Sequence, residues 1–222
     1  MHIVYNIGIL IFAYLVGSIP TSVWIGRSFF GTDIREHGSK NAGSTNAMRI
    51  LGWKVGLTVL TLDMFKGWLA VNLIHLTNYY IPETGDFIEF QLLLGIAAIL
   101  GHIFPVYVGF RGGKGVATLF GLVLAINPEP TLICIGVFVI TLLISKYVSL
   151  SSMISAFAFP ILVIFVFKTT TPSLVIFSLI LAVLLLFTHQ KNLERLLRKE
   201  ERKVLFLMSK KRRESERLKQ SA

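Results

Sequence analysis

Long apolar runs alternate with short polar segments along the whole of this 222-residue chain. The first run, from Met1 to Ile25, contains no Asp, Glu, Lys or Arg, and about 20 apolar residues suffice for a helix to cross a bilayer. Later runs of similar character cover residues 55–76, 90–108, 116–145, 153–167 and 173–188. The pattern predicts an all-α, polytopic membrane protein.

Helix-breaking residues interrupt these runs at two places. Asn127-Pro128-Glu129-Pro130 falls in the middle of the 116–145 run, where two prolines and a carboxylate are costly inside a single span. We therefore expect two short spans joined by a tight turn there, which makes about seven transmembrane helices in all. Gly17-Ser18-Ile19-Pro20-Thr21 predicts a kink near the cytosolic end of the first span.

The charges of the polar segments set the expected orientation. The chain carries 22 Lys and Arg against 12 Asp and Glu, a formal net charge of +10. With seven crossings, one side of the membrane receives the basic tail and Arg27, Arg35, Lys40, Arg49, Lys54, Arg111, Lys114 and Lys146. The other side receives Glu83, Asp86, Glu129 and Lys168. Because Lys and Arg accumulate in cytoplasmic loops, we expect the amino terminus outside and the carboxyl terminus in the cytosol.

Composition narrows the class of protein. With 54% hydrophobic residues and a mean hydropathy of +0.70, the chain leaves no soluble module for nucleic acid, so no nucleic-acid partner is expected. The first run lacks a basic n-region and a cleavage site, which favours a retained span over a secretory signal. We expect one transmembrane domain over residues 1–202 and a basic cytosolic tail over residues 203–222, which either contacts anionic lipid or is simply solvated.

Three side chains inside the apolar runs fit structural roles. Asp63 and Lys66 lie three residues apart in the second span, so they share a helix face and are expected to form an internal ion pair. This packing role is favoured over a proton path. Cys134, the single cysteine, lacks the cationic neighbours that would activate a thiol, so we interpret it as a small buried hydrophobe.

Four polar segments share the predicted cytosolic side and are candidates for one site. They are residues 39–49, residues 111–115, residues 149–152, and His189 with Asn192, which share a helix face at a spacing of three. Within the first segment, Ser44 or Thr45 is a candidate cap for a short helix that carries Arg49. Together the segments offer backbone N–H groups, hydroxyls, amides and cations, a set that suits a phosphate group.

Several known kinds of site do not fit these segments. Residues 111–115 are not a Walker A motif, because Val108 stands six positions before Lys114 and Gly115 follows it. No strand pattern precedes them, which argues against a dinucleotide fold. The histidines lie on separate elements without the spacing of a metal site, so neither a metal nor another cofactor is expected. A short phosphorylated metabolite that meets a lipid fits best.

Three groups of residues carry a resemblance to a known family. The first is Gly17-Ser18-Ile19-Pro20 with Asp33-Ile34-Arg35, Gly38-Ser39-Lys40-Asn41 and Thr45-Asn46. The second is Gly101-His102-Ile103-Phe104-Pro105-Val106 with Phe110-Arg111-Gly112-Gly113-Lys114-Gly115-Val116-Ala117-Thr118. The third is His189, Asn192, Arg195, Leu196 and Glu201. They resemble the three motifs of the bacterial acyl-phosphate:glycerol-3-phosphate acyltransferases (PlsY). Departures occur at Lys40, Ser151 and Lys199, where that family often has glycine.

The resemblance implies a transferase that moves a fatty acyl group from acyl phosphate to the 1-hydroxyl of glycerol 3-phosphate and yields lysophosphatidic acid and phosphate, the first step of phospholipid synthesis. It implies that Lys114 and Ser39 act with His189 and Asn192 in catalysis. The residues expected to bind substrate or phosphate are Ser39, Asn41, Thr45, Asn46, Arg49, Arg111, Gly112, Gly113, Lys114, Gly115, Ser149, Ser152, His189 and Asn192. The glycines are expected to contribute backbone donors, and Glu201 is expected to pack the third motif.

The same resemblance implies the setting of the reaction. It places the protein in a bacterial inner membrane, with its active site facing the cytosol and with membrane lipid as a partner. A single chain is expected to function as a monomer.

Two alternatives stay open at the level of sequence. His189 is followed five residues later by Glu194 rather than Asp, so the His-x4-Asp motif is absent, and the base is either His189 or a substrate phosphate. The alternative function is a transporter of a phosphorylated metabolite, because broken spans and an intramembrane ion pair suit transport. A pure assembly subunit is a further alternative, although it has no use for residues 111–115. Polar residues that gather at one surface, rather than at mid-membrane, favour the enzyme.

Overall fold

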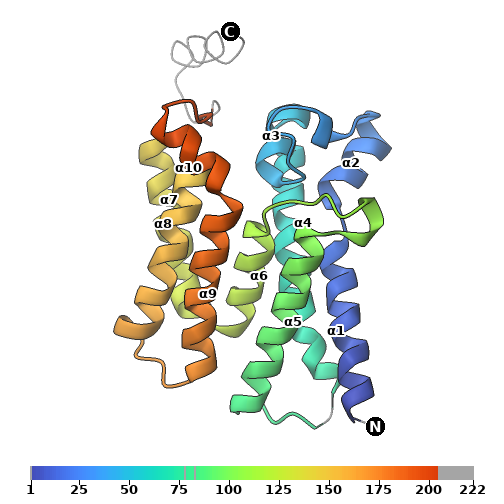
Figure 1. Ribbon diagram of the computed structural model, residues 1–222, viewed down its shortest axis with the longest axis vertical. Helices are drawn as coiled ribbons and strands as arrows, with labels where there is room; N and C mark the ends of the chain where they lie inside the picture. The colour runs from blue at the N-terminus through green and yellow to red at the C-terminus, as the bar shows by residue number, and fades with distance from the viewer. Residues whose placement is uncertain (1, 78, 83, 205–222) are drawn as a thin grey trace. The chain divides into compact units, whose positions relative to one another are not determined.

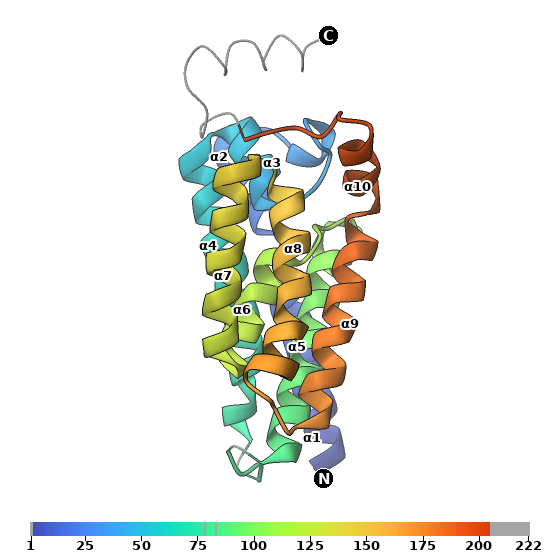
Figure 2. The same ribbon diagram turned by 90° about the vertical axis from the view of Figure 1, so that its left-hand side faces the viewer.

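The computed structural model describes residues 2–77, 79–82 and 84–204, and within these ranges every regular element is helical. The all-α prediction is therefore confirmed. The chain divides into two compact units (Figures 1 and 2). Unit 1 comprises Met1–Glu129 and Thr171–Leu174, and unit 2 comprises Pro130–Thr170 and Val175–Ala222.

Within unit 1, the residues that the structure describes form the first six α-helices and three short 3-10 turns. The helices are α1 (His2–Ser18), α2 (Thr21–Phe30), α3 (Ser44–Leu51), α4 (Trp53–Asn72), α5 (Gly85–Ile103) and α6 (Val116–Ile126), and the turns are η1 (Ile34–Glu36), η2 (Leu73–Leu76) and η3 (Val106–Val108). The predicted kink is confirmed, because α1 and α2 meet at an angle of 43° across Ile19-Pro20. Only Asn127 separates α6 from the next helix, which confirms the break in the 116–145 run.

The described residues of unit 2 form four α-helices and one π-helical segment. They are α7 (Pro128–Ser145), α8 (Val148–Ile161), the π segment η4 (Leu162–Val166), α9 (Pro172–Thr188) and α10 (Gln190–Leu197). Pro160 lies inside α8, directly before η4. Because proline removes a backbone donor, a local change of helical register after it is the expected accommodation.

Fewer helices are long enough to cross a membrane than the sequence predicts. Among the described residues, four helices are long and apolar enough to cross a membrane, or up to six if each of two bent pairs counts as one span. The helix over Val116–Ile126 has only 11 residues, a rise of about 16 Å, which is short for a bilayer core. Seven crossings therefore remain a prediction.

Close helix contacts in unit 1 depend on small residues. On α4, a Cβ built at Gly67 would overlap the backbone of Thr118, and on α6 a Cβ at Gly121 would overlap the backbone of Met64. The two glycines thus lie on facing sides of the α4–α6 contact. Membrane helices pack mainly through such close van der Waals contact, because lipid is as apolar as their side chains.

The polar segments of unit 1 gather at one end. Residues 31–52 precede the start of α4, and residues 104–115 follow the end of α5, so these antiparallel helices carry both segments to the same end (Figure 1). In unit 2, the α7–α8 turn and α10 share one end, and the α8–α9 connection lies at the other (Figure 2). The fold therefore gathers the predicted site segments of each unit at one end of that unit.

Two local expectations need correction. Ser149 and Ser152 lie in the first turns of α8 rather than in a connector, since the helix begins at Val148. The short helix that carries Arg49 is present, but its N-cap is Gly43, and no side chain caps it. Ser44 and Thr45 are therefore its first helical residues. Of the basic tail, residues 205–222 lie outside the described residues.

A prediction concerns the α4–α6 contact. Gly121→Leu should lower the melting temperature of the detergent-solubilised protein strongly, because overpacking costs about 1–3 kcal/mol or more. Gly136→Leu on α7 is the matched control, because nothing lies within 4 Å of a Cβ there. Equal melting temperatures for the two variants, measured by intrinsic fluorescence, would contradict the packing argument.

Candidate active site

Arg35 fastens the two polar segments of unit 1 to each other. Its guanidinium donates from Nε and Nη2 to the Asp33 carboxylate at 2.8–3.2 Å. Its Nη1 donates to the carbonyl oxygens of Val108, at 2.8 Å, and of Arg111, at 3.1 Å. Asp33 also accepts from Arg27 at 2.8 Å. The glycine-rich loop is thus tied at its start to a segment more than 70 residues earlier in the chain.

We call the Asp33–Arg35 pair, with its bonds to the carbonyl oxygens of Val108 and Arg111, the clasp. Its geometry shifts the pKa values of both charged groups. The Arg35 side chain, with help from its own backbone N–H, holds the pKa of the Asp33 carboxyl well below its usual range, although burial opposes the shift. Asp33 in turn raises the pKa of Arg35. Charge-assisted bonds of this bidentate kind are the strong ones among protein hydrogen bonds. Both partners therefore stay charged at neutral pH.

Asn46 supports the first motif from inside rather than offering itself to a ligand. The side chain is 1% exposed. Its Nδ2 donates to the carbonyl oxygens of Ile34, at 2.8 Å, and His37, at 3.1 Å, while its Oδ1 accepts from the backbone N–H of Ser39 at 2.9 Å. The amide of Asn46 thus holds the turn that presents Ser39, and phosphate binding by Asn46 stays a prediction.

The glycines of the second motif pack closely but do not all offer backbone donors. The N–H of Gly112 donates to the carbonyl oxygen of Ile103, and the N–H of Gly113 donates to the carbonyl oxygen of His102, both at 3.1 Å. These two amides therefore cap the carboxyl end of α5. A Cβ on Gly112 would overlap the His102 carbonyl oxygen, and one on Gly113 would overlap the His102 imidazole. The groups of this loop that we expect to donate hydrogen bonds to phosphate are therefore the side chains of Arg111 and Lys114 and the backbone N–H groups after Gly113.

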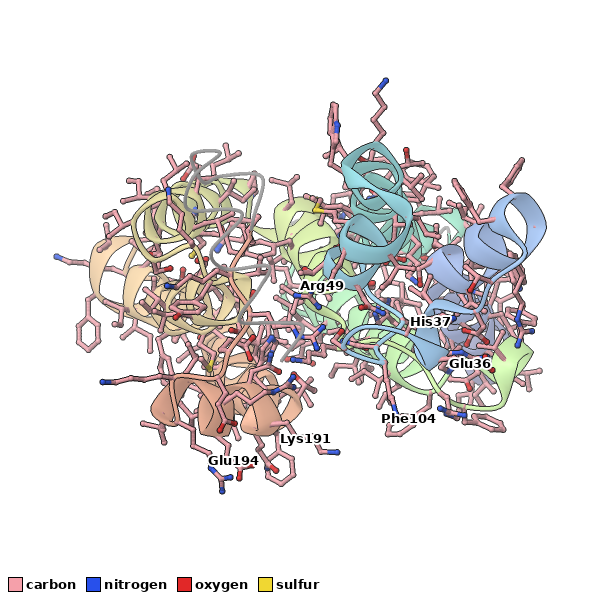
Figure 3. The ribbon with its side chains drawn as sticks, turned by 90° about the horizontal axis from the view of Figure 1, so that it is seen from above. Glu36, His37, Arg49, Phe104, Lys191 and Glu194 are labelled. Carbon is pink, nitrogen blue, oxygen red and sulfur yellow. The ribbon has the colours of Figure 1, made fainter. Side chains whose placement is uncertain are left out.

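The remaining candidates of unit 1 differ in exposure. Arg49 on α3 and Arg111 are exposed. Ser39, Asn41, Thr45 and Lys114 are half-buried. Gly115 is buried, has a left-handed backbone at φ 79°, and serves as the N-cap of α6. Viewed from this end, Arg49 lies on α3, and Glu36 and His37 lie on the segment that leads into it (Figure 3).

His189 occupies the break between α9 and α10 in unit 2. The two helices meet at an angle of 62°, and His189 is the N-cap of α10, with φ −107° and ψ 8°. It therefore precedes the helix whose face it was expected to share with Asn192. Its side chain is 3% exposed, and its Nδ1 lies 2.9 Å from the carbonyl oxygen of Leu185. A proton on Nδ1 satisfies that carbonyl and makes Nε2 the acceptor of the neutral ring.

Glu201 joins two of the predicted site residues of unit 2. One carboxylate oxygen, Oε1, accepts from Ser149 at 2.9 Å and from Asn192 at 2.7 Å. The other, Oε2, lies 3.6 Å from Nε of Arg195. The carboxylate thereby ties the start of α8 to α10. The packing role expected for Glu201 agrees with these bonds.

The serines of α8 are buried and already bonded. Ser149 donates to Glu201, and Ser152 donates to the carbonyl oxygen of Val148 at 2.9 Å. Both residues are 5% exposed or less. As candidates for phosphate binding they can accept hydrogen bonds in this structure, and donation to a ligand requires the hydroxyl to rotate.

Arg35 contacts the site segments although the sequence does not assign it to the site. It stands in the first motif, at a spacing from Asp33 that permits a bidentate pair. In α10, Lys191 and Glu194 are exposed and point outward (Figure 3). Among the described residues, no group of three or more His, Cys, Asp or Glu side chains is arranged to hold a metal ion.

Comparison with known proteins places these features in a family. The sequence profile of the glycerol-3-phosphate acyltransferase family matches residues 7–199. The glycerol-3-phosphate acyltransferase of Chlorobium phaeobacteroides (strain BS1) is 40% identical, over 89% of this chain and 96% of that protein. That of Chlorobaculum tepidum is 38% identical, over 90% of this chain and 97% of that protein.

Solved structures agree with the sequence relatives. The crystal structure of PlsY, an integral membrane glycerol 3-phosphate acyltransferase, in its glycerol 3-phosphate form has a TM-score of 0.79 and 32% sequence identity, and the match covers 90% of this chain and 96% of that one. The lysophosphatidic acid form has a TM-score of 0.76. The chain belongs to the PlsY family of integral membrane glycerol-3-phosphate acyltransferases.

Proposed function

We propose that this chain transfers a fatty acyl group from acyl phosphate to the 1-hydroxyl of glycerol 3-phosphate and releases lysophosphatidic acid and inorganic phosphate. One observation carries the proposal. A relative that is 32% identical has been solved in a glycerol 3-phosphate form and in a lysophosphatidic acid form, which are the acceptor and the product of such a transfer. The transporter alternative has no comparable support.

The proposed setting is the cytosolic face of a bacterial inner membrane, with seven crossings and the amino terminus outside. The cations of the connectors in unit 1, from Arg27 to Lys114, belong to the end that carries residues 31–52 and 104–115. The positive-inside rule favours the cytosol for that end. A monomer is the proposed functional unit, because one chain carries every candidate site residue.

Acyl phosphate suits the side chains of the site better than a donor that needs strong acid–base catalysis. In the proposed step, the hydroxyl oxygen of glycerol 3-phosphate attacks the acyl carbonyl carbon. The bond from that carbon to the bridging oxygen of the phosphate breaks, and phosphate leaves with the electron pair. The leaving group is an anion, so its departure needs positive charge, which Lys114 and Arg111 supply.

The acceptor is proposed to lie against His189 and Asn192. The hydrogen bond between His189 Nδ1 and the carbonyl oxygen of Leu185 makes Nε2 the ring nitrogen that would accept from the hydroxyl. The Glu201 carboxylate accepts from the Asn192 amide and fixes its orientation. The proton of the hydroxyl passes either to Nε2 or to a phosphate oxygen of a bound substrate. Both routes balance, because the departing phosphate takes up a proton at neutral pH.

Arg35 is proposed as a positioning residue in this reaction. It contacts the carbonyls of Val108 and Arg111 rather than any expected ligand. Its effect on transfer would act through Arg111 and the loop that follows. Asp33 completes the clasp by fixing the orientation of the guanidinium.

The donor assignment has a direct test. Purified protein should form lysophosphatidic acid from palmitoyl phosphate and glycerol 3-phosphate, and should form none from palmitoyl-CoA. Lys114→Ala should reduce kcat/KM by about 100-fold, because a lost charge-stabilising donor typically has that effect. Lys54→Ala, at the start of α4, is the matched control. Comparable rates with palmitoyl-CoA, measured by radiolabel, would contradict the assignment.

The role of His189 can be separated from the role of a substrate phosphate. His189→Ala should lose about 100-fold in kcat, as is typical for a group engaged with the reacting proton. If His189 is the base, added imidazole should restore the rate, whereas a substrate phosphate as base leaves it unrestored. His75→Ala, at an exposed histidine of unit 1, should match the wild type throughout. Full activity of His189→Ala without imidazole would exclude a part for His189 in the transfer.

The Asp33–Arg35 clasp predicts a pH dependence of stability. Because the folded-state pKa of Asp33 lies below its usual value of 3.8, the contribution of this carboxylate is fully present above that pH and is lost as the pH falls further. Asp33→Asn should cost about 1 kcal/mol from pH 8 to pH 5, since a charge-assisted bond becomes a neutral one. The gap in melting temperature to the wild type should narrow below about pH 4. If the difference in melting temperature between Asp33→Asn and the wild type widened as the pH fell, the proposed stabilisation by the charged Asp33 would be contradicted.

A further inference from the structure

Five polar side chains are buried together in unit 1, and the proposed transfer step uses none of them. They are Thr21 of α2, Asp63 and Lys66 of α4, His102 of α5 and Thr118 of α6, each 7% exposed or less. Lys66 Nζ lies 2.8 Å from Asp63 Oδ1, and Thr21 donates to the same oxygen at 3.0 Å. Ionisable groups among apolar helices are costly, so such a cluster calls for a reason beyond packing.

The cluster lies where three helices end or begin. Lys66 also donates to the carbonyl oxygen of Ile19, at 2.8 Å, in the break between α1 and α2. His102 is in the last turn of α5, and Thr118 is in the first turn of α6. Residues 104–115, which carry the glycine-rich loop, start and stop at two of these places, the end of α5 and the start of α6. A shift of the cluster would therefore move that loop.

His102 is the member of the cluster that contacts the glycine-rich loop. Its Nδ1 lies 3.0 Å from Thr118 Oγ1 and 3.9 Å from Asp63 Oδ1. At the other edge of the ring, Nε2 lies so close to Gly113 that a Cβ there would overlap it. The imidazole thus fills the space between the first turn of α6 and the loop that leads into it.

We propose that His102, held by Thr118, is a positioning residue that sets the path of residues 112–115 and hence the place of Lys114. Both segments that flank Lys114 contact this one side chain, Gly113 before it and Thr118 after it. Asp63, which pairs with Lys66, lies 3.9 Å from Nδ1 of the same ring. The consequence for catalysis rests on the proposed function, because it requires Lys114 to act on phosphate.

Thr118 offers a matched pair of variants. Thr118→Val keeps the shape of the side chain but removes the hydroxyl that bonds His102, whereas Thr118→Ser keeps the hydroxyl and loses a methyl group. Both changes disturb a fully buried side chain, so both should lower the melting temperature. Only Thr118→Val should loosen the loop. If the role of Thr118 were only structural, exchange in the loop would instead rise in both variants, in step with the fall of their melting temperatures.

The first readout is amide hydrogen exchange of the full-length protein in detergent. In Thr118→Val, peptides covering residues 109–117 should exchange about tenfold faster than in the wild type, while peptides from the middle of α5 stay unchanged. Thr118→Ser should exchange as the wild type does. Unchanged exchange in Thr118→Val, or equal acceleration in both variants, would overturn the positioning role.

The second readout is transfer activity with palmitoyl phosphate. Thr118→Val should lose about 10-fold to 100-fold in kcat/KM, and Thr118→Ser should stay within about threefold of the wild type. Faster exchange with unchanged transfer would support the positioning of the loop and contradict the role proposed for Lys114. The two hypotheses therefore fail separately.

A second variant covers the case in which Thr118→Val does not fold. Gly113→Ala presses on the same imidazole from the loop side, so it should accelerate exchange of residues 109–117 and reduce transfer by at least tenfold. Gly8→Ala on α1, where nothing lies within 4 Å of a Cβ, is its control and should match the wild type. Normal exchange and activity of Gly113→Ala would overturn the proposal.

Discussion

A buried polar group without a partner is strongly unfavourable among apolar helices, and this constraint arranges most of the chain. Inside unit 1 it is met by pairing, since Lys66 and Thr21 both bond Asp63, and His102 bonds Thr118. Elsewhere the polar residues lie at the ends of helices. The loop over residues 104–115 therefore begins and ends beside a buried polar cluster to which α2, α4, α5 and α6 each contribute.

The same constraint divides the motif residues into supports and candidates for chemistry. Gly112 and Gly113 complete the carboxyl end of α5, Asn46 closes the turn before α3, and Glu201 joins α8 to α10. These groups have partners within the fold, so each of them supports the local structure of its segment. The proposed chemistry then falls chiefly to the cations of the glycine-rich loop in unit 1 and to the buried imidazole of His189 in unit 2. A site built in this way depends on the rigidity of its supports.

The departures from the family pattern have a common backbone explanation at two of three positions. Lys40 and Lys199 have left-handed backbones, with φ of 58° and 61°, a region in which glycine is unstrained. The chain keeps both bends with lysine, at a cost of roughly 1 kcal/mol at each position. Ser151 differs, because it lies inside α8 and donates to the carbonyl oxygen of Tyr147. Its helical position requires no glycine.

Sequence by itself determined the helical class, the kink at Pro20, the break at Asn127 and the grouping of cations on particular connectors. These features depend on hydropathy, proline and charge, which act locally and can be counted along the chain. Tertiary structure alone decided that Arg35 grips the carbonyls of Val108 and Arg111, that Asn46 faces inward, and that the glycines pack on His102. Sequence pattern shows that a donor needs an acceptor, but only the packing of helices distant in sequence brings a particular pair within bonding distance.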